Sequence, residues 1–224
     1  MSDYARDVIK EVNGLTSQLI AVGLCTDANF PRHSVHPGKY GNVNDISIPN
    51  LDETAAALKE QPYRDTYNAL RETRAYNMLL IDGAMIQFRY RFLSEELLKH
   101  SLCFFPSPDL LEYQNDPDVY ETDLLYADVI AKDIVTSPIR FDFDIKGFVD
   151  YLHPASHFTI GQYKNCRIPV SGGVTPFRFI NFVLRAFYST AFNERCSEWT
   201  GSVADFGITV SPRERADLHW QFAI

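Results

Sequence analysis

Two aspartates and two histidines lie close together in one stretch of the chain, between residues with the apolar pattern of strands. They are Asp142, Asp144, His153 and His157. Carboxylates and imidazoles held side by side can bind a metal ion or act as general acid and base. The same residue types on a solvated strand face also form structural ion pairs. The sequence alone leaves both interpretations open.

Arginines near these residues are candidates for binding phosphate or nucleic acid, because a guanidinium can hold a phosphate through two parallel hydrogen bonds. They are Arg140, Arg167, Arg178 and Arg185. Between residues 138 and 192, basic residues (Arg140, Lys146, Lys164, Arg167, Arg178, Arg185) outnumber acidic ones (Asp142, Asp144, Asp150), although the whole chain has a formal net charge of −8. This local excess has two interpretations: chance together with structural ion pairs, or an anion- or phosphate-facing surface.

None of the familiar catalytic motifs is complete. His157-Phe158-Thr159 matches one half of the paired His-x-Thr motif of two-histidine phosphoesterases, and no other histidine has Ser or Thr two residues later. There is no phosphate-binding glycine loop, no Gly-x-Ser-x-Gly elbow and no His-Glu-x-x-His. The sequence therefore leaves open whether the chain is an enzyme. It predicts no cofactor, except a divalent metal of unknown identity if the chain is a nuclease.

The elements that must position these residues are short strands. In 138–144, Ile139, Phe141 and Phe143 alternate with Arg140, Asp142 and Asp144. In 156–162, His157 and Thr159 alternate with Phe158 and Ile160. Because successive side chains of a strand point to opposite faces, each strand has one polar side. If the two strands are neighbours, their polar sides share one face, with His153 at its rim.

The remaining pattern predicts an α+β fold with a mainly antiparallel sheet and flanking helices. Expected helices are 2–24, two between 52 and 73 interrupted at Pro62, and 175–192, which starts at the capping residue Thr175. Asp82-Gly83 between two apolar runs predicts a hairpin of 78–81 and 84–92, extended by a strand at 98–105. Residues 25–49 are expected to be irregular up to a short strand at 45–48. Residues 124–131 fit a helix or a strand.

Composition predicts a single domain over 1–224, with an N-terminal helix and loop (1–50), a core (51–195) and a C-terminal docking segment (196–224). No apolar run approaches the ~20 residues needed to span a bilayer, so no membrane association is expected. Four widely spaced cysteines and the lack of a signal-peptide core predict reduced thiols in the cytoplasm. The acidic net charge argues against free-standing binding to nucleic acid.

Five sequence blocks, in order, resemble a bacterial family catalogued as a domain of unknown function (family 2290). The blocks are LLIDGAMIQFRYRF, HSLCFFPSP, IRFDFD, HPASHFTIGQYKNCRIPV and TPFRFINFVLRAFY. The resemblance implies no reaction, but members of the family occur beside a helicase gene in anti-phage defence pairs. One departure from the family pattern lies in the strand predicted at 98–105, where Ser101 stands in place of an expected arginine.

The leading hypothesis is therefore a regulatory or sensing component of bacterial antiviral defence. It would act in complex with a helicase-type ATPase from the same operon, with nucleic acid reached through the complex. The alternative is a nuclease or phosphodiesterase that uses Asp142, Asp144, His153 and His157, with Arg140 and Arg167 on the phosphate. A third hypothesis is a sensor that binds a phage protein or a nucleic-acid end through the locally positive segment.

Overall fold

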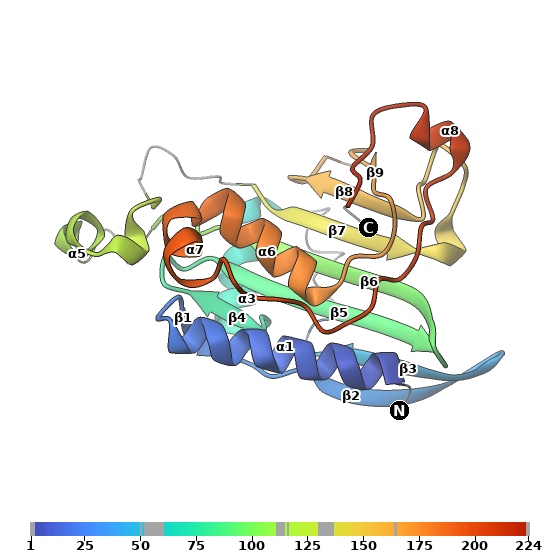
Figure 1. The fold of residues 1–224 in the computed structure, drawn as a ribbon, viewed down its shortest axis with the longest axis horizontal. Coiled ribbons are helices and arrows are strands. Elements are labelled where there is room, and N and C mark those ends of the chain that lie inside the picture. The colour runs from blue at the N-terminus through green and yellow to red at the C-terminus, as the bar shows by residue number, and fades with distance from the viewer. Residues whose placement is uncertain are drawn as a thin grey trace.

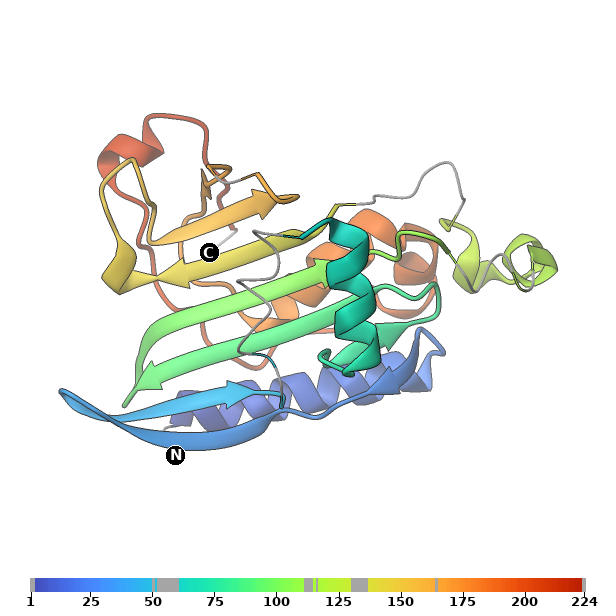
Figure 2. The same cartoon turned by 180° about the vertical axis from the view of Figure 1, so that it is seen from behind.

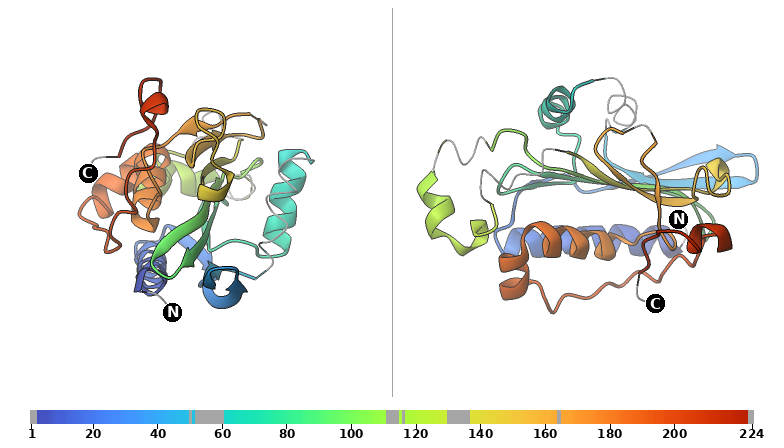
Figure 3. Two further views of the ribbon diagram at one scale, coloured as in Figure 1. Left: turned by 90° about the vertical axis from the view of Figure 1, so that its right-hand side faces the viewer. Right: turned by 90° about the horizontal axis from the view of Figure 1, so that it is seen from above.

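The computed structural model describes residues 3–49, 51, 61–110, 115, 117–129, 137–163 and 165–222. Within these ranges, a nine-stranded antiparallel sheet has helices on both faces (Figure 1). Helices α1 (Asp3–Ala21) and α6 (Pro176–Phe187) cover one face, and α3 (Tyr63–Glu72) lies on the other (Figure 3). The predicted α+β fold with a mainly antiparallel sheet is confirmed.

The sheet has the order β1-β4-β5-β6-β7-β8-β9, and β2 and β3 form a hairpin attached to β5. β4 pairs with the beginning of β5 and β3 with its end, so both lie along the same edge of this long central strand. The strands are β1 (Cys25–Ala28), β2 (Arg32–Gly38), β3 (Gly41–Ser47), β4 (Met78–Leu80), β5 (Met85–Leu93), β6 (Glu96–Phe105), β7 (Ile139–Asp144), β8 (Ser156–Ile160) and β9 (Ile168–Pro169). Short helices are α5 (Pro117–Thr122), η1 (Leu124–Tyr126), η3 (Ile145–Gly147), α7 (Ser189–Arg195) and α8 (Pro212–Arg215).

The predicted meander of β4, β5 and β6 is confirmed, with a loop one residue longer than the sequence suggested. Leu80 N–H donates to the Ala84 carbonyl at 2.7 Å, which leaves three residues in the loop between them. Gly83 has φ 84°, the left-handed conformation that this type of loop needs and that glycine adopts without strain. Asp82 has no positive φ, and its side chain accepts from Ala84 N–H at 3.1 Å.

The main core lies between the sheet and the two helices α1 and α6. Alternate residues of β5 (Ile86, Phe88, Tyr90, Phe92) are fully buried there. α1 contributes an apolar stripe (Val8, Val12, Leu15, Leu19), and α6 contributes Phe179, whose ring centroid is 5.7 Å from that of Phe88. Thr175 caps α6 by accepting from Arg178 N–H, and Pro176 follows at the first helical position, as predicted. The other side of β5 is thereby directed away from α1 and α6.

Two predictions about local structure were wrong. Residues 25–49 form β1, β2 and β3 instead of an irregular loop. Pro37 lies in the edge strand β2, where its missing N–H costs no sheet hydrogen bond. The helix predicted for 175–192 is divided at Tyr188 into α6 and α7. Asp128 explains this break, because its carboxylate accepts from Thr190 N–H at 2.6 Å and so satisfies the first turn of α7.

Other expectations are met or lie partly outside the described residues. α1 agrees with the predicted N-terminal helix, and α3 begins directly after Pro62. The helix predicted before Pro62 falls on residues 52–60, which lie outside the described ranges. The ambiguous segment 124–131 contains η1, and its last two residues are also outside. In the C-terminal segment, the ring of Trp220 stacks on that of Phe158, with centroids 4.5 Å apart.

Candidate functional site

The face of the sheet opposite α1 and α6 carries a polar pocket. At one end of this face, α3 crosses the strands (Figure 2). Its Tyr67 and Leu70 form a small apolar cluster with Met85, Cys103 and Phe105. Farther along the same strands, polar side chains of β5 to β8 line a cavity of about 390 Å³. Its walls include Arg89, Arg91, Lys99, Ser101, Arg140, Asp142, Asp144, His153, His157, Thr159 and Arg167. Helix α6 lies on the opposite face of the sheet (Figure 3), and none of its residues lines this pocket.

Strand register brings the candidate residues together. β7 pairs with β8 so that Asp142 is opposite His157 and Arg140 is opposite Thr159, as expected for neighbouring strands. On the other side of β7, Asp142 is opposite Ser101 of β6, which in turn is opposite Arg89 of β5. A row of polar side chains therefore crosses four strands on one face. Directly opposite residues lie ~5 Å apart, close enough for neighbouring side chains to interact.

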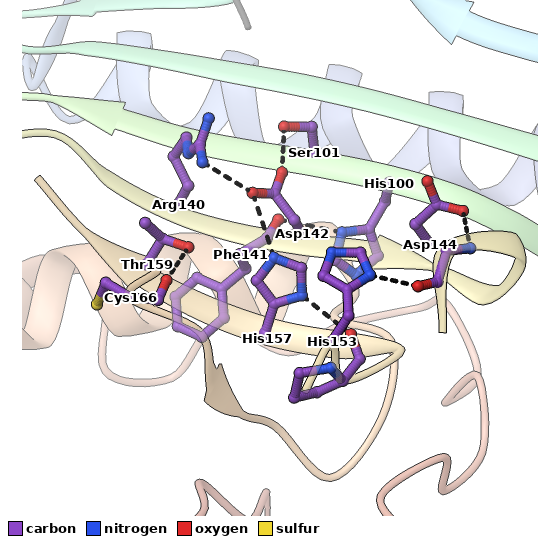
Figure 4. A network of polar contacts seen from close by, with 12 residues as sticks. His100, Ser101, Arg140, Phe141, Asp142, Asp144, His153, His157, Thr159 and Cys166 are labelled. Carbon is purple, nitrogen blue, oxygen red and sulfur yellow. Dashed lines mark hydrogen bonds and ion pairs between the residues drawn. The ribbon is translucent and has the colours of Figure 1, made fainter. Parts of the chain in front are cut away.

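Asp142 is the centre of this row. Ser101 Oγ donates to Asp142 Oδ1 at 2.7 Å, and Arg140 Nη2 lies 3.4 Å from Oδ2 (Figure 4). Nε2 of His157 is 3.9 Å from the same Oδ2 atom, too far for a hydrogen bond but close enough for electrostatic attraction. The sequence analysis did not include Ser101 in the site. The alternation of β6, with His100 and Leu102 buried in the core, was the signal that would have placed it on the polar face.

The two histidines of the pocket are held in the same way. His157 Nδ1 donates to the Pro154 carbonyl at 3.1 Å, and His153 Nδ1 donates to the Gly147 carbonyl. A carbonyl only accepts, so both Nδ1 atoms carry hydrogen and both Nε2 atoms of the neutral rings are unprotonated. The ring centroids are 5.2 Å apart, and both Nε2 atoms point toward the side of Asp142 (Figure 4). Burial lowers the pKa of His157, against the opposing influence of Asp142.

A tight turn between β7 and β8 places His153. Val149 and His153 exchange two backbone hydrogen bonds, of 3.0 and 2.8 Å, and Tyr151 at the tip has φ 69°. Asp144 holds the start of the same loop, because its side chain accepts from the N–H groups of Lys146 and Gly147 at 3.1 Å. Burial alone would raise the pKa of Asp144, but Lys99 at 3.2 Å and these N–H groups bring it below its usual range. The geometry therefore assigns Asp144 to the loop and separates its role from that of Asp142.

The pocket wall has more positive than negative charge. Five cationic side chains line it (Arg89, Arg91, Lys99, Arg140, Arg167) against two carboxylates (Asp142, Asp144). Arg89 and Arg91 also reach the buried Asp45 of β3, at 3.1 and 2.6 Å. Within the described ranges, Arg167 is the one cation of this wall that forms no ion pair with a carboxylate. The pocket can therefore attract an anion into a chain that is acidic as a whole.

Arg178 and Arg185, the other two candidates for phosphate binding, lie on α6 and therefore on the opposite face of the sheet. Arg178 forms a bidentate ion pair with Asp205 at 2.8 and 2.7 Å and lies over the Phe222 ring. Arg185 lies over the ring of Phe192. Both border a broad hollow between α6 and the C-terminal segment. The sequence spacing of these arginines gave no indication that a layer of sheet separates them from Arg140 and Arg167.

The donor set of the pocket does not match a metal centre. Among the described residues, no group of three or more His, Cys, Asp or Glu side chains is arranged to hold a metal ion. The Asp144 side chain is bound to N–H groups of the loop, so the remaining candidate ligands are Asp142 and the two imidazoles. Asp142 is already engaged by Ser101 and Arg140. Within the residues that the structure describes, no helix has the length and apolar character needed to cross a membrane.

Fold and pocket together define an α+β protein with a net-positive, histidine-containing pocket on one face of an open antiparallel sheet. The chain belongs to the family described as "Uncharacterized conserved protein (DUF2290)", whose model matches residues 24–222. This confirms the family that the five sequence blocks suggested. No curated protein and no solved structure matches the chain.

Proposed function

We propose that the polar pocket binds a phosphate-bearing ligand of the nucleic-acid class. The observation that carries this proposal is the excess of cationic over acidic side chains in the pocket of a chain with a net charge of −8. A surface with no ligand of its own gains little from gathering like charges, which repel one another. Phosphate is the anion that guanidinium groups bind in a geometrically specific, bidentate manner.

Arg167 and Arg140 are the residues proposed to contact the phosphate. Arg167 lines the pocket together with His157, and its positive charge adds to the effect of burial in lowering the pKa of His157. Arg140 is held by Asp142 at the floor of the pocket. Nucleic acid is favoured over a small anion because the pocket extends over several strands, from Arg91 of β5 to Arg167 beyond β8.

The test is the affinity of the full chain for fluorescently labelled single-stranded oligonucleotides, measured by anisotropy at several salt concentrations. Arg167→Ala should weaken binding about tenfold and reduce the slope of log K against log salt by about one, as expected for one lost phosphate contact. Arg185→Ala on the opposite face is the matched control and should bind as the wild type does. Equal affinities of the Arg167 variant and the wild type would refute the proposal.

We further propose that the chain is a regulatory or sensing component of bacterial antiviral defence, in complex with a helicase-type ATPase from the same operon. Its membership of the family supports this role, together with an exposed apolar rim beside the pocket. The rim belongs to the β7–β8 loop and includes Phe148, Val149 and Leu152, which are 38, 51 and 74 % exposed. Apolar and aromatic side chains of this kind form the centres of protein interfaces.

Co-expression of the chain with the helicase from its own operon, followed by size-exclusion chromatography at micromolar concentration, tests this second proposal. The two proteins should elute together, and Leu152→Asp should separate them. Tyr40→Asp, at an equally exposed position in the β2–β3 turn, is the control and should leave the complex intact. Separate elution of the wild-type proteins would remove the support for a helicase partner.

A further inference from the structure

We propose that the pocket cleaves RNA without a metal ion, with the ribose 2′-hydroxyl as nucleophile and the two histidines of the pocket as general base and general acid. This inference rests on the proposed binding of a nucleic-acid phosphate. It specifies the substrate class and the chemistry of that same pocket.

The protonation pattern of His153 and His157 is the first observation. Each ring donates from Nδ1 to a backbone carbonyl, so the ring is fixed in orientation and Nε2 is the nitrogen that can take up or release a proton. Neither Nε2 atom makes a hydrogen bond with any residue in the described part of the chain. Two imidazoles with ring centroids 5.2 Å apart thus direct reactive nitrogens to the same side, where Asp142 lies (Figure 4).

The ligand set is the second observation. Hydrolysis of a phosphodiester by an activated water commonly uses one or two metal ions, which generate the nucleophile and stabilise both oxygens of the displacement. Among the described residues the pocket does not provide a three-ligand group for such an ion. A substrate that carries its own nucleophile avoids this requirement, because a well-oriented intramolecular group has an effective molarity of roughly 10⁵–10⁸ M. RNA has such a group in its 2′-hydroxyl and DNA lacks it.

The roles follow from the surroundings of each ring. His157 is buried, and burial favours its neutral form, so its Nε2 takes the proton of the 2′-hydroxyl. The 2′-oxygen forms a bond to phosphorus while the bond from phosphorus to the 5′-oxygen breaks. His153 fills the complementary role: its protonated ring gives the Nε2 proton to the leaving 5′-oxygen. The products are a 2′,3′-cyclic phosphate and a 5′-hydroxyl, and no water or redox partner is consumed.

Charged neighbours are suitably placed for this step. The Asp142 carboxylate, 3.9 Å from His157 Nε2, stabilises the imidazolium that forms there. Arg140 and Arg167 lie on the walls of the pocket, where they can oppose the charge of the phosphoryl oxygens. Ser101 fixes the Asp142 carboxylate from the other side.

The experiment compares three labelled oligonucleotides of one sequence, RNA, DNA and 2′-O-methyl RNA, incubated with the full chain in excess EDTA. We expect cleavage of the RNA alone, with 2′,3′-cyclic phosphate ends identified by mass spectrometry. His157→Asn, whose amide retains a donor toward Pro154, should reduce the rate at least 100-fold, within the range of general acid–base catalysis. His36→Asn on the exposed strand β2 is the control and should cleave at the wild-type rate.

Each outcome separates this inference from the binding proposal. If the RNA binds with Arg167-dependent affinity but stays intact, the cleavage inference fails and the binding proposal stands. Cleavage of DNA, or cleavage abolished by EDTA, would overturn the 2′-hydroxyl mechanism. If His157→Asn melts far below the wild type, the 2′-O-methyl RNA still decides the chemistry, because that comparison uses the wild-type protein alone.

Discussion

Acidification should destabilise the fold through His100, which is fully buried between the sheet and the loop before α6. His100 Nδ1 donates to the Phe141 carbonyl at 3.2 Å, and Nε2 accepts from Val174 N–H at 2.9 Å. Only the neutral ring can make both hydrogen bonds. A proton on Nε2 would face the Val174 N–H directly and leave both donors without an acceptor in a dry environment.

The size of the effect follows from the pKa of His100, which burial lowers from 6.5 to about 4. Because the folded value is the lower one, the unfolded chain binds more protons between these two values. Stability from this group is therefore complete above the unfolded pKa and is lost as the pH falls toward about 4. At 1.36 kcal/mol per pH unit of difference, the full loss is about 3 kcal/mol, of which about 2 kcal/mol is lost between about pH 7 and about pH 4.5.

Urea unfolding monitored by tryptophan fluorescence across this pH range measures the effect. His100→Gln should be less stable at neutral pH but should lose about 2 kcal/mol less than the wild type on acidification, because an amide does not titrate there. His157 is present in both proteins, so its contribution cancels in the difference. If both proteins lost stability in parallel, His100 would not be the group responsible and its buried neutral state would be refuted.

Three further substitutions test the packing by urea unfolding. Gly14 is exposed within α1, and an added Cβ would have no atom within 4 Å. Gly14→Ala should therefore raise the free energy of unfolding by about 1 kcal/mol, because alanine favours a helix more than glycine does. No increase would contradict a regular helix at this position. Gly172→Ala brings a Cβ into a steric clash with the Gly207 carbonyl oxygen and should lower the free energy of unfolding by about 3 kcal/mol. An unchanged value would show that the C-terminal segment does not pack as described. Asp45→Ala removes the carboxylate that Arg89 and Arg91 share and should lower the free energy of unfolding by about 2 kcal/mol. The loss is smaller than for a fully buried ion pair because Arg91 reaches solvent. A neutral effect would indicate that other groups hold the two arginines.

Local patterns in the sequence were sufficient to predict most strands and the direction of their side chains. Alternation in 86–92 and 139–144 fixed which residues face the core, because a strand has only two sides. Thr175 and Pro176 defined the start of α6 for an equally local reason. The errors occurred where a distant residue decides the outcome. Asp128 starts α7 from outside the helix, and strand pairing orders residues 25–49 despite their prolines and glycines.

The candidate site could be predicted only in part, for the same physical reason. Alternation showed that Asp142 and His157 have polar surroundings, but the register that sets them opposite each other is a long-range property. The alternation of β5 puts Arg89 and Arg91 on the side away from the core, but nothing in the sequence indicates that this side faces the pocket. Arg178 and Arg185 were grouped with Arg140 because they are near in sequence, whereas α6 packs on the other face of the sheet.

Ser101 shows how one residue can set the character of this pocket. The resemblance to the family led us to expect an arginine here, at the centre of β6 and directly opposite Asp142. An arginine at this position would extend into the pocket and pair with the carboxylate, in competition with Arg140 and His157. Serine donates one short hydrogen bond to Oδ1 and leaves Oδ2 directed at Arg140 and His157. Because serine is small and neutral, space and negative charge remain beside the two imidazoles, and both are conditions that the proposed proton transfers require.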